Sequence, residues 1–190
     1  DVRLVGSEMC IRDRYKSVFA VILGTGVGAG YSVNKKIIVG PNKLTGEWGQ
    51  NPIPGPMDEY EKSVKRHCGR VGAVEVFLSG PGLENYYEHI TKTKISSRDI
   101  VSLYRENDLV AGEVMDVYFE RIARSFSTFV NILDPDVIVC GGGMSEIDEI
   151  YDEVPNRIIP YIASNFFLTP IVKATHGSSS GVRGAAHLWN

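Results

Sequence analysis

The sequence predicts an α/β fold in which helices pack on a mixed sheet. Three stretches of the chain lead to this prediction. Residues 18–39 hold two apolar runs joined by glycines, which is typical of a β-hairpin. Residues 108–133 repeat apolar side chains at the spacing of an amphipathic helix. Residues 136–143 are a short apolar run that ends in three glycines, and a helical pattern follows.

Composition limits the class of protein. The chain has 190 residues, of which 43% are hydrophobic and 23% charged, enough for one domain with a core. Its net charge of −3 gives no basic surface for nucleic acid, and no run of about 18 apolar residues predicts a membrane span. Three cysteines are few and odd in number, which favours a reducing compartment and hence the cytoplasm.

The first hairpin carries an unusual density of glycine. The apolar run Val18–Leu23 enters a stretch with glycine at positions 24, 26, 28 and 30, and Thr25 adds a hydroxyl. Glycine lets the backbone approach a ligand closely, and successive N–H groups in such a loop form a concavity that binds anions. The stretch therefore predicts a phosphate loop; the alternative is a glycine-rich hairpin that binds nothing.

The residues after these glycines distinguish between kinds of phosphate loop. A dinucleotide fingerprint needs a helix at this point, but Tyr31–Val39 is apolar and β-branched around Asn34-Lys35-Lys36. That pattern predicts strand, turn, strand. A Walker loop would end in Gly-Lys-Ser or Gly-Lys-Thr, which this stretch lacks. The glycines are therefore expected to join two strands of a hairpin.

A second glycine cluster lies near the C-terminus. Asp136–Cys140 is predicted as a buried strand, Gly141, Gly142 and Gly143 follow it, and Glu146–Ala163 is predicted as a helix. Strand, glycines and helix form a nucleotide-binding arrangement, because the N–H groups at the helix start are free to meet a polar ligand. The alternative is a tight strand-to-helix turn.

The remaining elements follow from pattern. Gly55–Lys65 is expected to be a polar loop. The further predicted elements are helices over Pro81–Thr91, Ser96–Glu106, Asp108–Leu133 and Val182–Trp189, and a strand over Pro170–Ala174.

Two glutamates are candidates for polar recognition. Glu47 lies between glycines ahead of Pro52, so it is expected on a loop, where its carboxylate offers only hydrogen-bond acceptors. Glu75 begins a helical pattern, where the helix dipole favours an acid. From the residues alone, a solvated loop acid is the favoured explanation of Glu47, and for Glu75 a helix-start acid is compatible with a binding role.

The segments GPNKLTGEWGQNPIP and VEVFLSGPG, taken with both glycine clusters, resemble the ROK family of sugar kinases and repressors. They are most similar to the bacterial fructokinase branch. The resemblance implies the actin-like ATPase (ribonuclease H-like) fold, made of two similar lobes. Residues 15–190 resemble the second, C-terminal lobe, and the first lobe is expected to be missing from this chain.

The resemblance also implies a reaction and a set of contacts. The activity would be transfer of the ATP γ-phosphoryl group to a hexose, with Mg²⁺, and fructose is the hexose that this branch implies. Glucose or N-acetylglucosamine is the alternative hexose, and a sugar-sensing repressor or a decayed lobe is the alternative function. The implied contacts are Gly24, Thr25, Gly26 and Gly28 for phosphates, Gly141, Gly142 and Gly143 for adenosine, and Glu47, Asn51 and Glu75 for the sugar. A homodimer is compatible with the resemblance.

One motif departs from the family pattern. Relatives usually hold a structural zinc with one His and three Cys, and here Gln50, Arg66 and Ala73 stand at those places, leaving only Cys68. A single thiolate does not build a tetrahedral zinc site. The sequence therefore predicts no metal, with hydrogen bonds or packing holding this loop instead.

The first residues do not fit the rest. Residues 1–14 match no part of the resemblance and are expected to be foreign or disordered. The family's catalytic Asp lies in an Asn-Asp-Ala-Asn motif that this chain lacks. No residue here is therefore assigned as catalytic, and the 190 residues alone are expected to be inactive.

Overall fold

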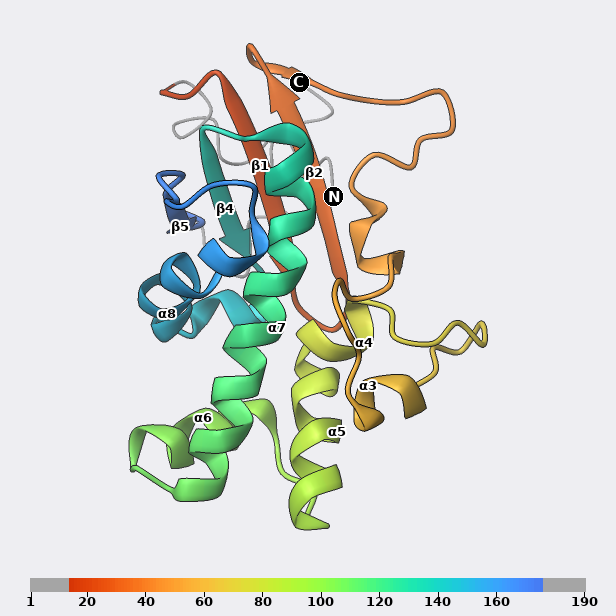
Figure 1. The fold of residues 1–190 in the computed structure, drawn as a ribbon, viewed down its shortest axis with the longest axis vertical. Coiled ribbons are helices and arrows are strands. Elements are labelled where there is room, and N and C mark those ends of the chain that lie inside the picture. Colours follow the sequence, from red (N-terminus) through yellow and green to blue (C-terminus); the bar gives the residue numbers. More distant parts are fainter. Residues whose placement is uncertain (1–13, 176–190) are drawn as a thin grey trace.

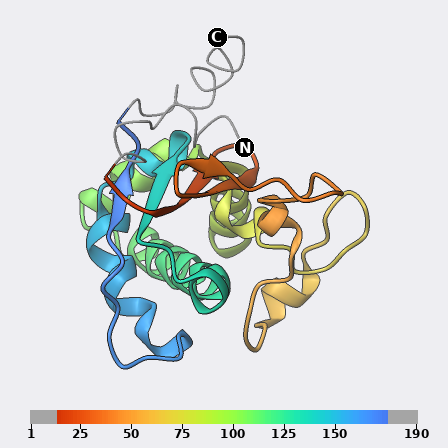
Figure 2. The same ribbon diagram turned by 90° about the horizontal axis from the view of Figure 1, so that it is seen from above.

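The computed structural model describes residues 14–175, in which helices pack against one face of a mixed sheet (Figures 1 and 2). The strand order is β3-β2-β1-β4-β5, with β1 in the middle. β1 pairs antiparallel with β2 and parallel with β4. The strands are β1 (Ser17–Leu23), β2 (Val27–Val33), β3 (Lys36–Ile37), β4 (Val137–Gly141) and β5 (Ile171–Lys173). The predicted α/β class with a mixed sheet is confirmed.

Six α-helices and three short 3₁₀ turns complete the described chain. The α-helices are α3 (Glu59–Ser63), α4 (Glu75–Leu78), α5 (Gly80–Thr91), α6 (Ser97–Arg105), α7 (Leu109–Leu133) and α8 (Glu149–Arg157). The 3₁₀ turns are η1 (Glu47–Gln50), η2 (Gly143–Glu146) and η3 (Ile159–Tyr161). The side chains of Ser79, Ser96 and Asp108 each accept a backbone N–H and so fix the starts of α5, α6 and α7.

The sheet is apolar on both faces. Along β1, Phe19, Val21 and Leu23 belong to the main core with the helices, while Val18 and Ala20 belong to a second buried cluster. This alternation follows from the two-residue period of a strand. It explains why β1 appears in the sequence as a continuous apolar run.

The long helix α7 packs along one face of the sheet (Figure 1). The ring of Phe129 on α7 stacks on Phe19 of β1 with centroids 4.0 Å apart. The Tyr118 hydroxyl donates a hydrogen bond of 2.9 Å to the Leu78 carbonyl at the end of α4. The expected apolar stripe is confirmed, because Ala111, Val114, Met115, Tyr118, Ile122, Phe126 and Phe129 are all buried and Leu133 is half-buried.

The glycine-rich hairpin is tighter than the sequence suggested. Gly28 and Gly30 are not in the loop; they pair with Ile22 and Ala20 inside β2, so the turn is Gly24–Gly26 alone. The expected second turn, between β2 and β3, is present. Asn34 and Lys35 there have positive φ angles of 49° and 64°, as in the primed turns of hairpins.

The predicted helix over Glu146–Ala163 is wrong in its bounds. The 3₁₀ turn η2 follows β4, the chain is extended at Ile147, and α8 begins only at Glu149. At the other end, Pro160 has no N–H to continue the helix, and a 3₁₀ turn replaces it. The second glycine cluster therefore leads into a tight 3₁₀ turn and not directly into an α-helix.

The segment predicted as the polar loop Gly55–Lys65 contains a helix. Asp58 and Glu61 form a reciprocal capping box at the start of α3, and the Glu61 side chain is buried. Five of these residues are charged, but one charge points inward because two arginines of α7 meet it.

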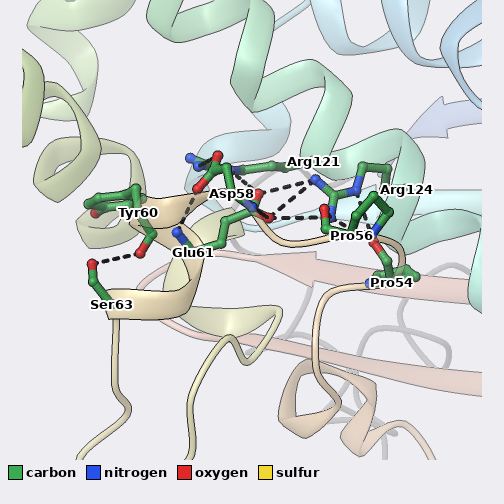
Figure 3. A network of polar contacts seen from close by, with 8 residues as sticks. All are labelled: Pro54, Pro56, Asp58, Tyr60, Glu61, Ser63, Arg121 and Arg124. Atoms are coloured by element: carbon green, nitrogen blue, oxygen red, sulfur yellow. Dashed lines mark hydrogen bonds and ion pairs between the residues drawn. The ribbon is translucent and has the colours of Figure 1, made fainter.

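These charges form the buried network in Figure 3. Arg121 Nε donates to Glu61 Oε1 over 2.9 Å, and both side chains are almost fully buried. Arg124 Nη1 contacts the same oxygen at 3.2 Å, and its Nη2 donates to the Pro54 carbonyl at 2.7 Å. The Arg121 guanidinium also lies 4.2 Å from the centre of the Tyr86 ring. The network fastens the segment after η1 to α7.

Some sequence predictions lie outside the described residues. Residues 1–13, most of the segment expected to be foreign or disordered, are among them, as is the helix predicted over Val182–Trp189. None of the helices between residues 14 and 175 combines the length and apolar composition needed to cross a bilayer.

Replacing Glu61 with alanine should strongly destabilise the protein. The substitution would leave the buried Arg121 with only the 3.3 Å contact to the more exposed Asp58. Breaking one side of a buried ion pair costs about 3–5 kcal/mol, measured as the free energy of unfolding in denaturant.

The matched control is Glu59→Ala on the same helix. The Glu59 carboxylate pairs with Lys62 but is 92% exposed, so its removal should leave the unfolding midpoint nearly unchanged. Equal losses in the two variants would contradict a special role for the buried pair.

Candidate functional site

A pocket of about 1000 Å³ opens where the carboxyl ends of β1 and β4 meet. This is where ligands bind in open α/β sheets. Its volume suits a ligand the size of a nucleotide. The lining residues are Gly24, Thr25, Gly80, Pro81, Glu84, Ser96, Ser97, Arg98, Val101, Ser102, Arg105, Gly143, Met144, Glu146 and Ile147. Both glycine clusters predicted from the sequence therefore contribute to one cavity.

The first glycine turn is held by backbone hydrogen bonds. The Gly24 N–H donates to the Gly26 carbonyl at 3.0 Å, and the Gly80 N–H donates to the Gly24 carbonyl at 2.8 Å. Thr25 is exposed and lines the pocket. Gly28 is buried in β2, and neither it nor Gly26 is among the lining residues. The pocket wall is thus formed by Gly24 and Thr25 within this turn.

The three glycines of the second cluster differ in their surroundings. Gly141 is the last residue of β4. Gly142 has a φ of +88°, and a Cβ there would lie 2.4 Å from the Leu23 carbonyl oxygen. Gly143 is exposed, and a Cβ there would meet nothing within 4 Å. Only Gly143 of the three lines the pocket.

The opposite wall comes from the start of α6, which sequence reasoning missed. A Cβ built on Gly80 would lie 3.5 Å from Ser97 Oγ and 3.8 Å from the Gly24 carbonyl, so α6 comes close to the glycine turn. Arg98 lines the same wall. Ser97 with Asp99 predicted a helix start here, and the structure places the cap one residue earlier, at Ser96. No local signal says which cavity a helix start faces.

An ion pair joins α6 to α8 at the pocket. Arg105 donates to both carboxylate oxygens of Glu149, at 2.7 and 2.9 Å. These hydrogen bonds hold the pKa of Glu149 below its ordinary value. The stability from this pair is therefore present at neutral pH and is lost as pH falls through that lowered pKa.

Glu75 lies beside the pocket and touches the glycine turn. It is the first residue of α4, as the helix-start interpretation predicted. Its Oε2 accepts the Val27 N–H at 3.3 Å, and its Oε1 accepts Arg66 Nε at 2.9 Å. A Cβ at Gly26 would come within 2.8 Å of the same Oε2, so the glycine gives the carboxylate room.

Glu47 is the first residue of η1 and Asn51 follows its last, and η1 packs on β2. A Cβ at Gly49 would lie 2.3 Å from the Val27 carbonyl oxygen, so the turn sits directly on β2. The Asn51 carbonyl accepts the Val74 N–H at 2.8 Å, which ties the end of η1 to the start of α4. Glu47 is exposed. None of Glu47, Asn51 and Glu75 is among the pocket-lining residues, so their assignment to the sugar stays a prediction.

Comparison with known proteins decides the family. A family model described as the ROK family matches residues 5–190. The chain belongs to the ROK family. It is 38% identical over 176 residues to an N-acetyl-D-glucosamine kinase of Vibrio atlanticus, covering 90% of this chain and 58% of that protein. It is 35% identical over 179 residues to an N-acetyl-D-glucosamine kinase of Yersinia enterocolitica, covering 92% of this chain and 59% of that protein. The chain thus spans less than two thirds of the length of these ROK relatives.

Solved ROK structures share the fold. A ROK hexokinase from Thermus thermophilus superposes with a TM-score of 0.81 at 19% identity, over 97% of this chain and 61% of that one. A ROK glucokinase from Streptomyces griseus in complex with glucose and AMPPNP superposes with a TM-score of 0.81 at 20% identity. The superposition covers 97% of this chain and 66% of that one. The expected actin-like ATPase fold is confirmed. The relatives above are named as N-acetylglucosamine kinases and not as fructokinases, so the fructokinase branch is not supported.

The loop at which the family resemblance implied a zinc site is closed by hydrogen bonds, as expected. Lys65 and Val71 form a β-bridge, the Arg66 N–H donates to the Arg70 carbonyl at 2.8 Å, and the Ile53 N–H donates to the Gly72 carbonyl at 2.7 Å. Residues 14–175 contain no group of three or more His, Cys, Asp and Glu side chains placed to hold a metal ion. The absence of zinc stays a prediction.

Cys68, the remaining cysteine of that motif, is exposed in this loop. A hydrogen bond from the Arg70 backbone, together with the nearby Arg66 side chain, lowers the pKa of its thiol. Burial instead raises the pKa of the Cys140 thiol to about 12, which supports the interpretation of Cys140 as an inert core residue.

Substitution by alanine should destabilise the protein at Gly142 but leave its stability nearly unchanged at Gly143. Gly142→Ala forces a side chain onto the Leu23 carbonyl at a positive φ, and it should cost about 2–4 kcal/mol of unfolding free energy. Gly143→Ala meets open space, so stability should change by less than about 0.5 kcal/mol. Thermal or denaturant unfolding measures both; a stable Gly142→Ala protein would contradict the close packing described here.

Proposed function

We propose that this chain forms the nucleotide-binding and sugar-binding part of an ATP-dependent sugar kinase of the ROK family. The observation that supports the proposal is that the predicted phosphate, adenosine and sugar contacts lie on connected elements. Both glycine clusters contribute to one pocket, and Glu75 is hydrogen-bonded to Val27, directly after the glycine turn. A phosphate donor and a carbohydrate acceptor could thus be held side by side.

The pocket fits a nucleotide by its chemistry as well as its size. Gly24 and Thr25 present backbone and hydroxyl groups suited to phosphates, and the exposed Gly143 leaves a flat surface suited to adenosine. Gly26, Gly28, Gly141 and Gly142, which the sequence also assigned to the nucleotide, are proposed to shape the walls from within. Mg²⁺ accompanying ATP would offset the phosphate charge.

Glu47, Asn51 and Glu75 are proposed to hold the sugar. Glu47 and Glu75 supply carboxylate acceptors for hydroxyl groups, and Asn51 adds an amide. The backbone bond from Val74 to Asn51 keeps the two acids on adjacent elements. N-acetyl-D-glucosamine is the best supported hexose, because the similar kinases of Vibrio atlanticus and Yersinia enterocolitica carry that name. Fructose, expected from the sequence, is the competitor to be tested.

The catalytic base is proposed to lie outside these 190 residues. Three acids in or near the pocket already accept donors: Glu75 from Arg66, Glu84 from the Ser97 N–H at 2.9 Å, and Glu146 from Lys173 at 2.8 Å. An acceptor that is engaged in this way is poorly placed to remove a proton from a sugar hydroxyl. Hexose-dependent ATP consumption by the 190 residues alone would contradict this part of the proposal.

A sugar-responsive repressor is the second candidate function. A ROK transcriptional regulator superposes with a TM-score of 0.78 at 19% identity, which shows a shared fold alone. The open, glycine-lined pocket favours the kinase, because a sensor of sugar has no need for a phosphate site. Hexose-dependent ATP consumption is expected of the kinase and not of the repressor.

The substrate is tested by ADP release from the full-length protein with a panel of hexoses. We expect kcat/KM for N-acetyl-D-glucosamine to exceed that for fructose by about tenfold or more, since a site built around a polar group rejects substrates lacking it. A preference for fructose would restore the fructokinase interpretation. No turnover with any hexose would refute the kinase.

The division of the site is tested with two variants. Glu47→Gln should raise the hexose KM about 10–100-fold, the usual loss for one hydrogen bond to a charged group, with little change in the ATP KM. Gly143→Val should do the reverse, because it places a branched side chain where the pocket is open. Steady-state kinetics measures both. If either variant changed the two KM values alike, the proposed division would be wrong.

A further inference from the structure

We propose that Arg66 is a positioning residue that orients the Glu75 carboxylate for sugar binding. The inference rests on the proposed function, since it takes Glu75 as a sugar contact. The Arg66 side chain reaches Glu75 from a neighbouring loop and not from the helix that carries the glutamate. Its role would be to fix an acceptor and not to react.

Each of the two oxygens of Glu75 accepts a hydrogen bond. Oε1 accepts Arg66 Nε at 2.9 Å, and Oε2 accepts the N–H of Val27, the first residue of β2, at 3.3 Å. A carboxylate held at both oxygens loses its rotational freedom. Of its roughly four acceptor positions, the remaining ones point in set directions and stay free for hydroxyl donors.

The position of Arg66 is itself well determined. Its backbone N–H donates to the Arg70 carbonyl and its carbonyl accepts the Gly69 N–H, both at 2.8 Å, so the residue belongs to a closed turn. Its Nη1 also lies 3.8 Å from Cys68 Sγ, within the limit for a contact to sulfur. The guanidinium is therefore directed by the loop around it.

The pair is sheltered enough for its geometry to persist. The side chains of Arg66 and Glu75 are 18% and 24% exposed, in contrast to pairs such as Glu59 and Lys62, which are 92% and 57% exposed. Partial burial reduces screening by salt and restricts alternative rotamers. An arginine keeps its charge at every physiological pH, so the carboxylate has a constant partner.

The consequence of losing Arg66 would be specific. Glu75 would keep its place at the start of α4, which is secured by the bond from Tyr118 to Leu78. Its carboxylate, however, would be held only by the Val27 N–H and could rotate away from the sugar. We therefore expect an effect on sugar affinity rather than on the nucleotide pocket or the fold.

The test measures hexose KM, ATP KM and kcat in the full-length protein, with N-acetyl-D-glucosamine, fructose and glucose. Arg66→Ala should raise the KM of the preferred hexose about tenfold or more, with the ATP KM within about twofold of wild type. Arg66→Lys should recover part of the loss, because lysine restores the charge but not the planar geometry. The matched control is Arg70→Ala in the same loop, whose exposed side chain should be dispensable for every parameter.

A double-mutant cycle with Glu75→Gln separates the positioning role of Arg66 from the proposed sugar-binding function. If Arg66 acts through Glu75, its removal should add little to the hexose KM in the Glu75→Gln background. A raised hexose KM in Glu75→Gln with an unchanged one in Arg66→Ala would refute the role of Arg66 while leaving the proposed function intact. A general fall in melting temperature, with both KM values raised in Arg66→Ala, would make Arg66 merely structural. A wild-type protein that neither binds nor phosphorylates a hexose would overturn both.

Discussion

The structure depends on a close approach of three backbone segments at one end of the sheet. Gly142 lies against the Leu23 carbonyl, and Gly80 donates its N–H to Gly24, so β1, β4 and the start of α5 meet without side chains between them. A β-carbon at Gly142 would occupy space already filled by backbone. This contact brings two glycine clusters more than a hundred residues apart into one pocket, and everything proposed about a nucleotide depends on it.

The helix α7 provides the rigid support for that arrangement. It contacts β1 through Phe129, the end of α4 through Tyr118, and the segment after η1 through Arg121 and Arg124. The elements that carry Glu47 and Glu75 are thus both fastened to one helix, α4 by a hydrogen bond and the segment after η1 by ionic contacts. Such shared support keeps polar groups in fixed relative positions, which binding of a sugar requires.

The loop next to Glu75 shows how one structural solution can replace another. In relatives a metal is expected to brace this loop, whereas here a β-bridge and backbone hydrogen bonds close it. Arg66, which occupies the place of an expected cysteine, reaches the glutamate itself. Under the proposed function, this contact with Glu75 makes the departure from the expected pattern bear on sugar recognition and not only on stability.

The sequence by itself determined the elements whose patterns are local. The period of α7, the strands β1 and β4 and the hairpin were all predictable, because spacing and turn chemistry act over a few residues. Their bounds were less certain, as Gly28 inside β2 and the 3₁₀ turn after Gly143 show. Only the tertiary structure decided that Glu61 is buried, that α6 lines the pocket and that Arg66 meets Glu75. These facts depend on partners distant in the chain, and a charged residue looks the same in sequence whether its partner is water or an arginine.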